Sequence, residues 1–244
     1  MNWGTSFTIA VKELTIIRRK KSIISYIILL PIILSILFSL VVQNDIASPS
    51  GISPNYQLGL ESLTYFFVVF AAILPASIAA YSIVGEKVEK SLEPLLATPT
   101  TDGEILLGKS IASFVLPLLA IWGGACIFMV STDYLTYNLI SYYFFPNWTS
   151  GVMLLLLAPL AAIFSIELAV ILSSRVSDVR GANQVSGLLF IPFMAVFLAG
   201  VEGAISFDVN TLLIFSGIVL IVDIGLFFLS SSTFSREEIL TKWK

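Results

Sequence analysis

The chain is organised around the stretch 85-GEKVEKSLEPLLATPTTDGEILLGK-109, its longest charge-rich interval, which lies between two long apolar runs. Leu92, Leu95 and Leu96 have the i, i+3, i+4 spacing that places side chains on one side of a helix. This spacing predicts a short helix whose apolar face suits lipid or a groove on a partner protein. Three acids accompany the leucines and suit basic residues of a partner: Glu86, Glu89 and Glu93.

Two local signals divide this stretch into a helix, a break and a second helix. Thr98 precedes Pro99, and the residue before a proline disfavours helical geometry, so the first helix should end there. Thr101 and Glu104 have the capping-box spacing, in which each side chain accepts a hydrogen bond from the other residue's backbone N–H. A solvated loop between two membrane helices is the alternative interpretation of the whole stretch.

The composition indicates an integral membrane protein. Of the 244 residues, 57% are hydrophobic and 12% are charged, whereas soluble domains carry about 25% charged residues. A helix needs about 20 apolar residues to cross the hydrocarbon layer. We therefore expect an all-α integral membrane fold, a single transmembrane domain with six spans at residues 22–43, 62–84, 110–130, 152–173, 182–201 and 210–230.

Small residues and prolines predict how these spans pack and bend. Residues at four-residue spacing let helices approach closely, and two spans carry such stripes: Ala72, Ala76 and Ala80 in the second, and Ala161, Ser165, Ala169 and Ser173 in the fourth. A proline inside a membrane helix removes a hydrogen bond and kinks the helix. Each of the first five spans contains one: Pro31, Pro75, Pro117, Pro159 and Pro192.

The basic residues predict the orientation. All 13 Lys and Arg residues precede the first span, follow the sixth, or lie between the second and third or the fourth and fifth spans. The opposite loops carry only acids. Because cytoplasmic loops collect Lys and Arg, we expect both termini, the stretch 85–109 and the tail 231–244 to be cytoplasmic.

Residues 1–21 are predicted to form an amphipathic helix on the cytoplasmic membrane surface. Glu13 and the basic residues fall largely away from the apolar side of the helical wheel, and the basic end would be drawn to anionic lipid. A disordered basic tail that only sets the topology is the alternative. The apolar side of this predicted helix is formed by Phe7, Ala10, Val11, Leu14 and Ile17.

The segment Gly103–Ser110 fits the G-x-x-x-x-G-K-[ST] pattern of a phosphate-binding loop. We interpret this match as fortuitous, because such a loop follows a buried strand and offers a flexible cradle of backbone donors. Here the segment follows Thr-Pro-Thr-Thr-Asp, contains Ile-Leu-Leu and runs into a membrane span. With no His and one Cys in the chain, we expect no catalytic residue, cofactor, metal site or nucleic-acid partner.

Two acids lie inside predicted spans, Glu167 and Asp223. An ionisable group at the bilayer centre costs about +2.5 to +3.5 kcal/mol on insertion scales, so it should face the bundle or a water-filled cavity. Both residues are candidates for a transport pathway, and Asp223 is the better one because it lies near the middle of its span. A hydrogen bond between helices explains Asp223 equally well.

The segments EKVEKSLEPLLATP at 86–99 and EILLGK at 104–109 resemble the coupling region of the permease subunits of type-2 ABC transporters, the exporter-like family. Six spans, an amphipathic helix before the first and a short external hairpin before the sixth extend the resemblance over nearly the whole chain. Two positions depart from the pattern. Ser91 replaces a common glycine, and Pro94 interrupts the leucine face, so the coupling helix should begin near Leu92 or Glu93.

The resemblance implies an ATP-driven exporter in a prokaryotic cell membrane. Its permease would pair with a second copy or a paralogue and with two ABC ATPase subunits, which would bind the ATP and Mg. The residues implied to couple the permease to an ATPase are Glu86, Glu89, Leu92, Glu93, Leu95, Leu96, Thr98 and Pro99.

Two other functions remain open from the sequence. An ion- or proton-coupled secondary transporter could use Glu167 and Asp223, although the internal repeats and matched broken helices that such carriers often show are not apparent. A membrane scaffold could recruit a cytoplasmic protein through the leucines alone. Substrate-dependent ATP hydrolysis distinguishes an ABC permease from both, and the sequence does not identify the substrate.

Overall fold

The computed structural model describes residues 3–46, 56–88, 100–173, 184 and 187–233, and all the regular structure in them is helical. In chain order the elements are α1 (Trp3–Arg19), α2 (Lys21–Ile46), α3 (Tyr56–Val88), α5 (Asp102–Ile140), α6 (Trp148–Val152), the π-turn η1 (Met153–Leu157), α7 (Ala158–Ser173), α9 (Ile191–Val201) and α10 (Val209–Thr233).

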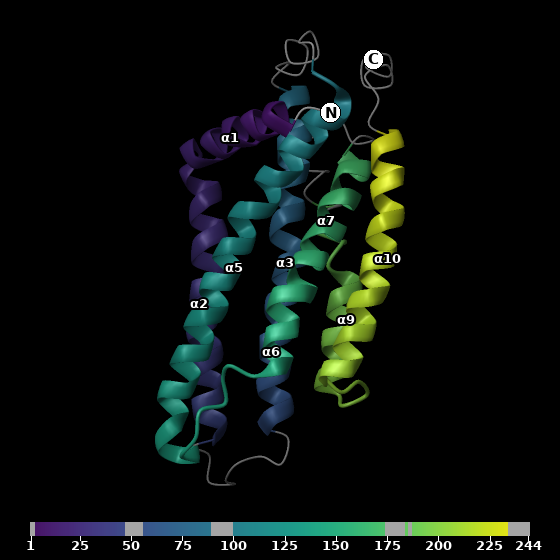
Figure 1. The fold of residues 1–244 in the computed structure, drawn as a ribbon. Coiled ribbons are helices and arrows are strands. Elements are labelled where there is room, and N and C mark those ends of the chain that lie inside the picture. The colour runs from purple at the N-terminus through teal and green to yellow at the C-terminus, as the bar shows by residue number, and fades with distance from the viewer. Residues whose placement is uncertain (1–2, 47–55, 89–99, 174–183, 185–186, 234–244) are drawn as a thin grey trace.

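The long helices form one bundle, and α1 lies across one end of it (Figure 1). The C-terminal end of α10 lies at the same end as α1. Helix α3 is central: 78% of its most apolar window is buried, against 22% in α2 and in α10. It packs chiefly against α7, while α2 packs chiefly against α5. The bundle therefore has an inner helix and two largely outward-facing ones.

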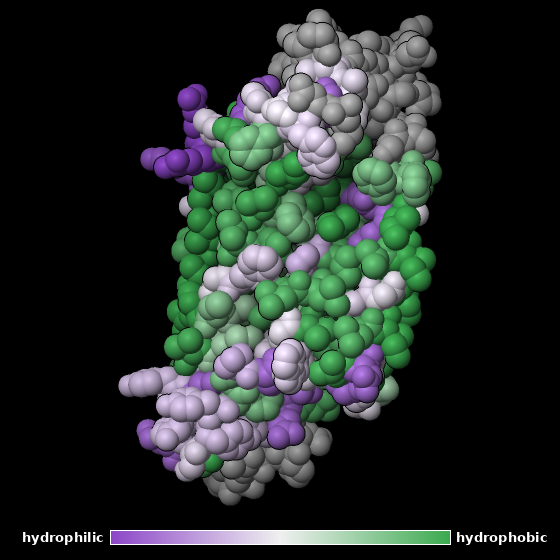
Figure 2. Space-filling model, in the orientation of Figure 1, coloured by the Kyte–Doolittle hydropathy of each residue, from purple (hydrophilic) through white to green (hydrophobic). Residues whose placement is uncertain are grey.

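Five of the described helices are long and apolar enough to cross a membrane. Figure 2 shows their apolar side chains as a broad band around the middle of the molecule, with hydrophilic residues gathered towards the two ends. Helix α5 has 39 residues and is therefore about 58 Å long, far longer than the hydrocarbon layer is thick. The five candidate spans are Lys21–Asn44, Tyr56–Ser82, Gly103–Ile140, Trp148–Leu172 and Val209–Ser230.

The fifth predicted span differs from the prediction. The described helix there, α9, has 11 residues and rises only about 16 Å, too little to cross the hydrocarbon layer by itself. Pro192 lies in its first turn, where the missing N–H of a proline costs nothing. Pro192 therefore begins a helix, and the expectation that it kinks the middle of one was wrong.

The other prolines lie inside or next to helices. Pro31, Pro75 and Pro117 are interior residues of α2, α3 and α5. Pro159 follows the π-turn, in which the N–H of Ala158 reaches back five residues to the carbonyl of Met153. A proline lacks an N–H and clashes with the carbonyl four residues before it, and a widened turn is one way in which a helix accommodates this defect.

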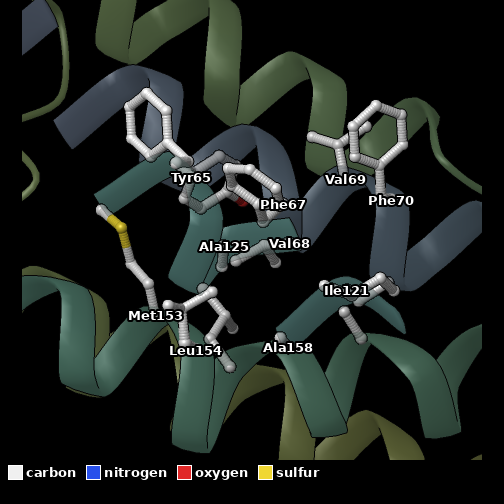
Figure 3. Packing of buried hydrophobic residues seen from close by; sticks show 14 of the residues in the cluster. Tyr65, Phe67, Val68, Val69, Phe70, Ile121, Ala125, Met153, Leu154 and Ala158 are labelled. Atoms are coloured by element: carbon white, nitrogen blue, oxygen red, sulfur yellow. The ribbon is translucent and has the colours of Figure 1, made fainter. Parts of the chain in front are cut away.

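Aromatic and small residues fill the centre. In Figure 3, Tyr65, Phe67 and Phe70 of α3 pack with Ile121 of α5 and Met153 of η1. Where the structure describes their side chains, at Ala72, Ala76, Ala80, Ala161, Ser165 and Ala169, the small-residue stripes of α3 and α7 are buried, which confirms that these helices pack against others. Lipid is as apolar as leucine, so close packing of this kind is what holds membrane helices together.

The hairpin between α9 and α10 is closed by an aromatic contact. The ring of Phe207 lies where a Cβ on Gly200 would be, at 2.1 Å, and stacks on Tyr65 of α3 with ring centroids 4.9 Å apart. Asp208 then caps α10, and hydrogen bonds from Thr211 and from the serine two residues before Asp208 lower the pKa of its carboxyl to about 2. These contacts fix the start of α10 against the bundle.

Helices α2 and α5 are joined by buried hydroxyl groups. Ser35 Oγ contacts the carbonyl oxygens of Pro31, at 2.5 Å, and of Gly124 across the interface, at 2.6 Å. One turn on, Ser39 Oγ lies 3.0 Å from Thr132 Oγ1. A Cβ added to Gly124 would lie 2.7 Å from Pro31 Cβ and 3.1 Å from its carbonyl carbon. The approach of α2 to α5 therefore requires glycine at position 124.

We predict that Gly124→Ala lowers the free energy of unfolding by about 1–3 kcal/mol, the usual cost of overpacking a filled core. Titration with SDS in mixed micelles measures it. The neighbouring Gly123 is the matched control, because nothing lies within 4 Å of a Cβ added there. Gly123→Ala should leave stability unchanged or slightly higher, since alanine favours helix over glycine. Equal effects of the two substitutions would contradict the packing described.

Candidate functional site

The candidate site is the end of the bundle where the charge-rich stretch leaves α3 and returns as α5. Most of the predicted coupling residues, Glu89, Leu92, Glu93, Leu95, Leu96, Thr98 and Pro99, lie outside the described residues. Glu86 belongs to α3, but its side chain is not among those described. The structure therefore describes the two helices that hold the stretch, and the coupling helix remains a prediction.

The predicted capping box is present at the return of the stretch. Thr101 is the N-cap of α5: its hydroxyl accepts a hydrogen bond from the N–H of Glu104 at 3.4 Å, and its own N–H donates to Glu104 Oε2 at 3.1 Å. Two backbone donors at the helix start are thus satisfied. This confirms that a new helix begins directly after the predicted break.

A buried ion pair and its hydrogen bonds join α1, α3 and α5 next to the two ends of the stretch 85–109. Lys109 of α5 donates hydrogen bonds to Glu13 Oε1 of α1 and to both the carbonyl and the hydroxyl of Ser82 of α3, each at 3.0 Å. The Ser82 hydroxyl in turn donates to Glu13 Oε2 at 3.1 Å. The side chains of Lys109 and Glu13 are only 3% and 5% exposed.

The geometry of this cluster meets the condition for burying charge. An ammonium has three N–H donors, and Lys109 has three acceptors at hydrogen-bond distance. Charges removed from water are costly unless they are both paired and hydrogen-bonded. Glu13, Ser82 and Lys109 therefore form a polar clamp, and we use that name for these three residues below.

The burial of α1 corrects the predicted helical wheel. Glu13, assigned to the polar side, is buried together with Ser6, Ile9, Ala10 and Ile17. Phe7 and Val11, assigned to the same apolar side as Ala10 and Ile17, are 66% and 46% exposed. The four-residue spacing of Ile9, Glu13 and Ile17 was a signal that could have placed Glu13 on the inner face. Helix α1 has two apolar faces, and periodicity alone did not separate them.

Close contact between α1 and α5 accounts for the glycine and lysine of the phosphate-loop pattern. A Cβ on Gly108 would lie 2.7 Å from Ile9 Cβ and 2.8 Å from the carbonyl oxygen of Ser6. Lys109 is held in the polar clamp. The segment 103–110 forms the first turns of α5. These features support the interpretation of the match as fortuitous.

A second contact fixes the junction of α1 and α2. Lys20, between the two helices, donates a hydrogen bond to the hydroxyl of Tyr81 on α3, and its ammonium lies 4.4 Å from the centroid of the Tyr81 ring. Tyr81 precedes Ser82 of the polar clamp. The middle of α1 and the residue that follows its C-terminal end are therefore attached to the same turn of α3.

The two intramembrane acids lie together between α7 and α10. Asp223 is only 4% exposed, and among the described residues neither of its carboxylate oxygens has a hydrogen-bond partner. Glu167 Oε2 is also buried without a partner, and the two carboxyl groups are close enough to interact electrostatically. The structure thus brings the two pathway candidates together.

At the opposite end of the bundle, a third acid holds the connection after α5. Asp133 accepts hydrogen bonds from the backbone N–H groups of Phe144 and Phe145, each at 3.1 Å. Nothing in the local sequence pattern distinguishes Asp133 from an ordinary loop acid, and its role was not predicted. The C-terminal part of α5 is therefore attached to the segment leading into α6.

Comparison with known proteins gives one family. A family model described as "ABC-2 family transporter protein" matches residues 7–211. This range includes the polar clamp, the charge-rich stretch and the helices from α2 to α9, and ends at the start of α10. No curated protein sequence matches the chain at a significant level.

We predict that Glu13→Leu and Lys109→Leu each lower the free energy of unfolding by about 3–5 kcal/mol, because each leaves a buried charge without its partner. The double substitution should recover most of this loss, since it removes both charges. Arg18→Leu, at an exposed position of the same helix, is the matched control and should change stability little. SDS titration of the four proteins measures the coupling, and additive losses would show that the two residues do not form a pair.

Proposed function

The chain belongs to the ABC-2 family of transporter proteins, and we propose that it is the permease of an ATP-driven exporter whose ATP is hydrolysed by separate subunits. The family match over residues 7–211 carries the assignment to a membrane transporter. Export, partnership with an ATPase and the coupling region are parts of the proposal.

The polar clamp supports a coupling role for the stretch 85–109. Ser82 lies shortly before the stretch and Lys109 ends it, and both bond to Glu13 of α1. A force applied to the stretch would reach α3 and α5 at points where they are joined to each other. A flexible linker would not transmit such a force. A stretch whose two ends are attached to α3 and α5 would transmit it to both helices.

In the proposed mechanism, Leu92, Leu95 and Leu96 occupy a groove on an ABC ATPase subunit, and Glu86, Glu89 and Glu93 contact its basic residues. Thr98 and Pro99 end the coupling helix. The ATPase subunits bind ATP and Mg, close on one another and pull this helix. The spans then reorient between inward-facing and outward-facing states.

The proposed orientation places the α1 end of the bundle in the cytoplasm. Arg18 and Arg19 end α1, and two further lysines follow them directly, in agreement with the tendency of basic residues to stay inside. Trp3, Phe7 and Val11 form an exposed apolar stripe on α1, which would enter the inner membrane surface beside the bundle. We also propose that residues 182–201 complete a sixth crossing, of which α9 is the outer part.

The transporter proposed here is a dimer of two such permeases, or of this chain and a paralogue, with two ATPases in a prokaryotic cell membrane. The outward-facing surfaces of α2 and α10 are available to lipid or to a second permease.

An ion- or proton-coupled secondary transporter is the second candidate. Glu167 Oε2 and both carboxylate oxygens of Asp223, which have no hydrogen-bond partner among the described residues, favour it. The two mechanisms differ in their energy source. Uncouplers of the proton gradient would stop a secondary carrier, whereas an ABC exporter would continue as long as ATP is supplied.

We predict that an ABC ATPase co-purifies with the chain after gentle extraction from its own membrane. Leu95→Asp should abolish the association, because it puts a charge on the apolar face, while the protein remains inserted. The control Lys90→Asp introduces the same carboxylate outside the leucine face and should retain the ATPase. Quantitative mass spectrometry of the purified material measures the ratio of subunits. Unchanged association after Leu95→Asp would contradict the proposed coupling face.

A further inference from the structure

A cavity of about 370 Å³ lies between α5, α7 and α10, in the half of the bundle nearer α1. Its wall is mainly apolar and includes Leu106, Phe114, Ile163, Ile166 and Phe227. Among the described lining residues one is charged, Glu167, and none is Lys or Arg. The cavity is thus an apolar space with one carboxylate on its wall.

A second acid, Asp223, lies near the carboxyl group of Glu167. The two groups are close enough to interact electrostatically, and among the described residues neither oxygen of the buried Asp223 has a hydrogen-bond partner. Asp223 and Ser230, which lines the cavity, are seven residues apart on α10 and are both buried. They lie on the same inward stripe of α10 because seven residues make nearly two turns. The two carboxyl groups therefore lie on one side of the cavity.

Physical chemistry restricts what can occupy this space. A carboxylate taken out of water is costly unless a cation or hydrogen-bond donors replace its hydration, and neither Glu167 Oε2 nor Asp223 has such a partner among the described residues. A cation in the cavity would supply the missing charge. A small hydrated ion would leave the apolar walls in contact with water, whereas an organic cation would cover them.

The aromatic residues favour the same occupant. Phe114 and Phe227 both line the cavity, and an aromatic face attracts a cation through its quadrupole while also packing against apolar groups. An apolar body beside the walls and a positive charge beside Glu167 would satisfy both parts of the site.

We propose that this cavity binds lipophilic organic cations, with the charge beside Glu167 and Asp223 and the apolar body between α5 and α10. The inference that such cations are the exported substrates rests on the function proposed above. The inference that the cavity binds them is independent of that function.

The experiment measures binding of tetraphenylphosphonium to the purified full-length chain in zwitterionic lipid nanodiscs by equilibrium dialysis. Saturable binding is expected. Tetraphenylborate, with nearly the same shape and the opposite charge, should not bind there. Tetramethylammonium, which has the charge without the apolar body, should compete at least about tenfold more weakly, since burial of apolar surface supplies much of the affinity.

Glu167→Gln and Asp223→Asn keep the shape of each side chain and remove its charge. Each should raise the dissociation constant of tetraphenylphosphonium about tenfold or more, as expected for loss of a buried charge partner. Ile163→Trp should weaken binding by filling the cavity while both acids remain. Glu202→Gln, at an exposed acid beyond α9, should leave binding unchanged. Size-exclusion profiles of all variants report whether they are folded.

Three results would overturn the proposal: no saturable binding to the folded wild-type chain, equal binding of tetraphenylborate, or an unchanged dissociation constant in both Glu167→Gln and Asp223→Asn. The assay contains neither ATP nor an ATPase, so its outcome is independent of the coupling test. Retained ATPase association together with absent binding would reject the cavity and leave the permease assignment intact.

Discussion

The ion pair between Lys109 and Glu13 is the contact on which the arrangement of the helices at the α1 end of the bundle depends. Two opposite charges that lose their hydration must remain together, because separating them leaves each one unpaired in a poorly polarisable surrounding. Ser82 completes the hydrogen bonds of both charges. Through these three residues α1, α3 and α5 are held in one relative position, and the close approach at Gly108 follows from it.

Much of the bundle could be predicted from the sequence because a bilayer imposes simple rules. The length of apolar runs predicted the segments that form the five long apolar helices, small-residue spacing predicted that α3 and α7 pack against other helices, and Thr101 with Glu104 predicted the start of α5. Each of these predictions depends on local spacing or on a rule that holds throughout the hydrocarbon layer: every backbone N–H and C=O group must be hydrogen-bonded within the protein.

The missed features depend on neighbours distant in the chain. Glu13 is charged, and only the arrival of Lys109, 96 residues later, makes its burial favourable. Asp133 receives its donors from a segment that follows α5, and Asp223 meets Glu167 from another helix. Pro192 shows a different limit, since a proline in an apolar run is compatible with a kink inside a helix and with a helix start.

Helix α5 is one continuous helix, with Pro117 in its interior, that runs from the α1 end of the bundle to the opposite end (Figure 1). It begins at the capping box beside the polar clamp and, about 58 Å further on by its 39 residues, it ends beyond Asp133 and its attachments. When a helix of this length tilts as a unit it acts as a lever: a tilt of about 10° around its middle moves each end by about 5 Å in opposite directions. A mechanical displacement at the α1 end would then arrive at the opposite end of the bundle with its sense inverted, without any relay of side-chain rearrangements between them.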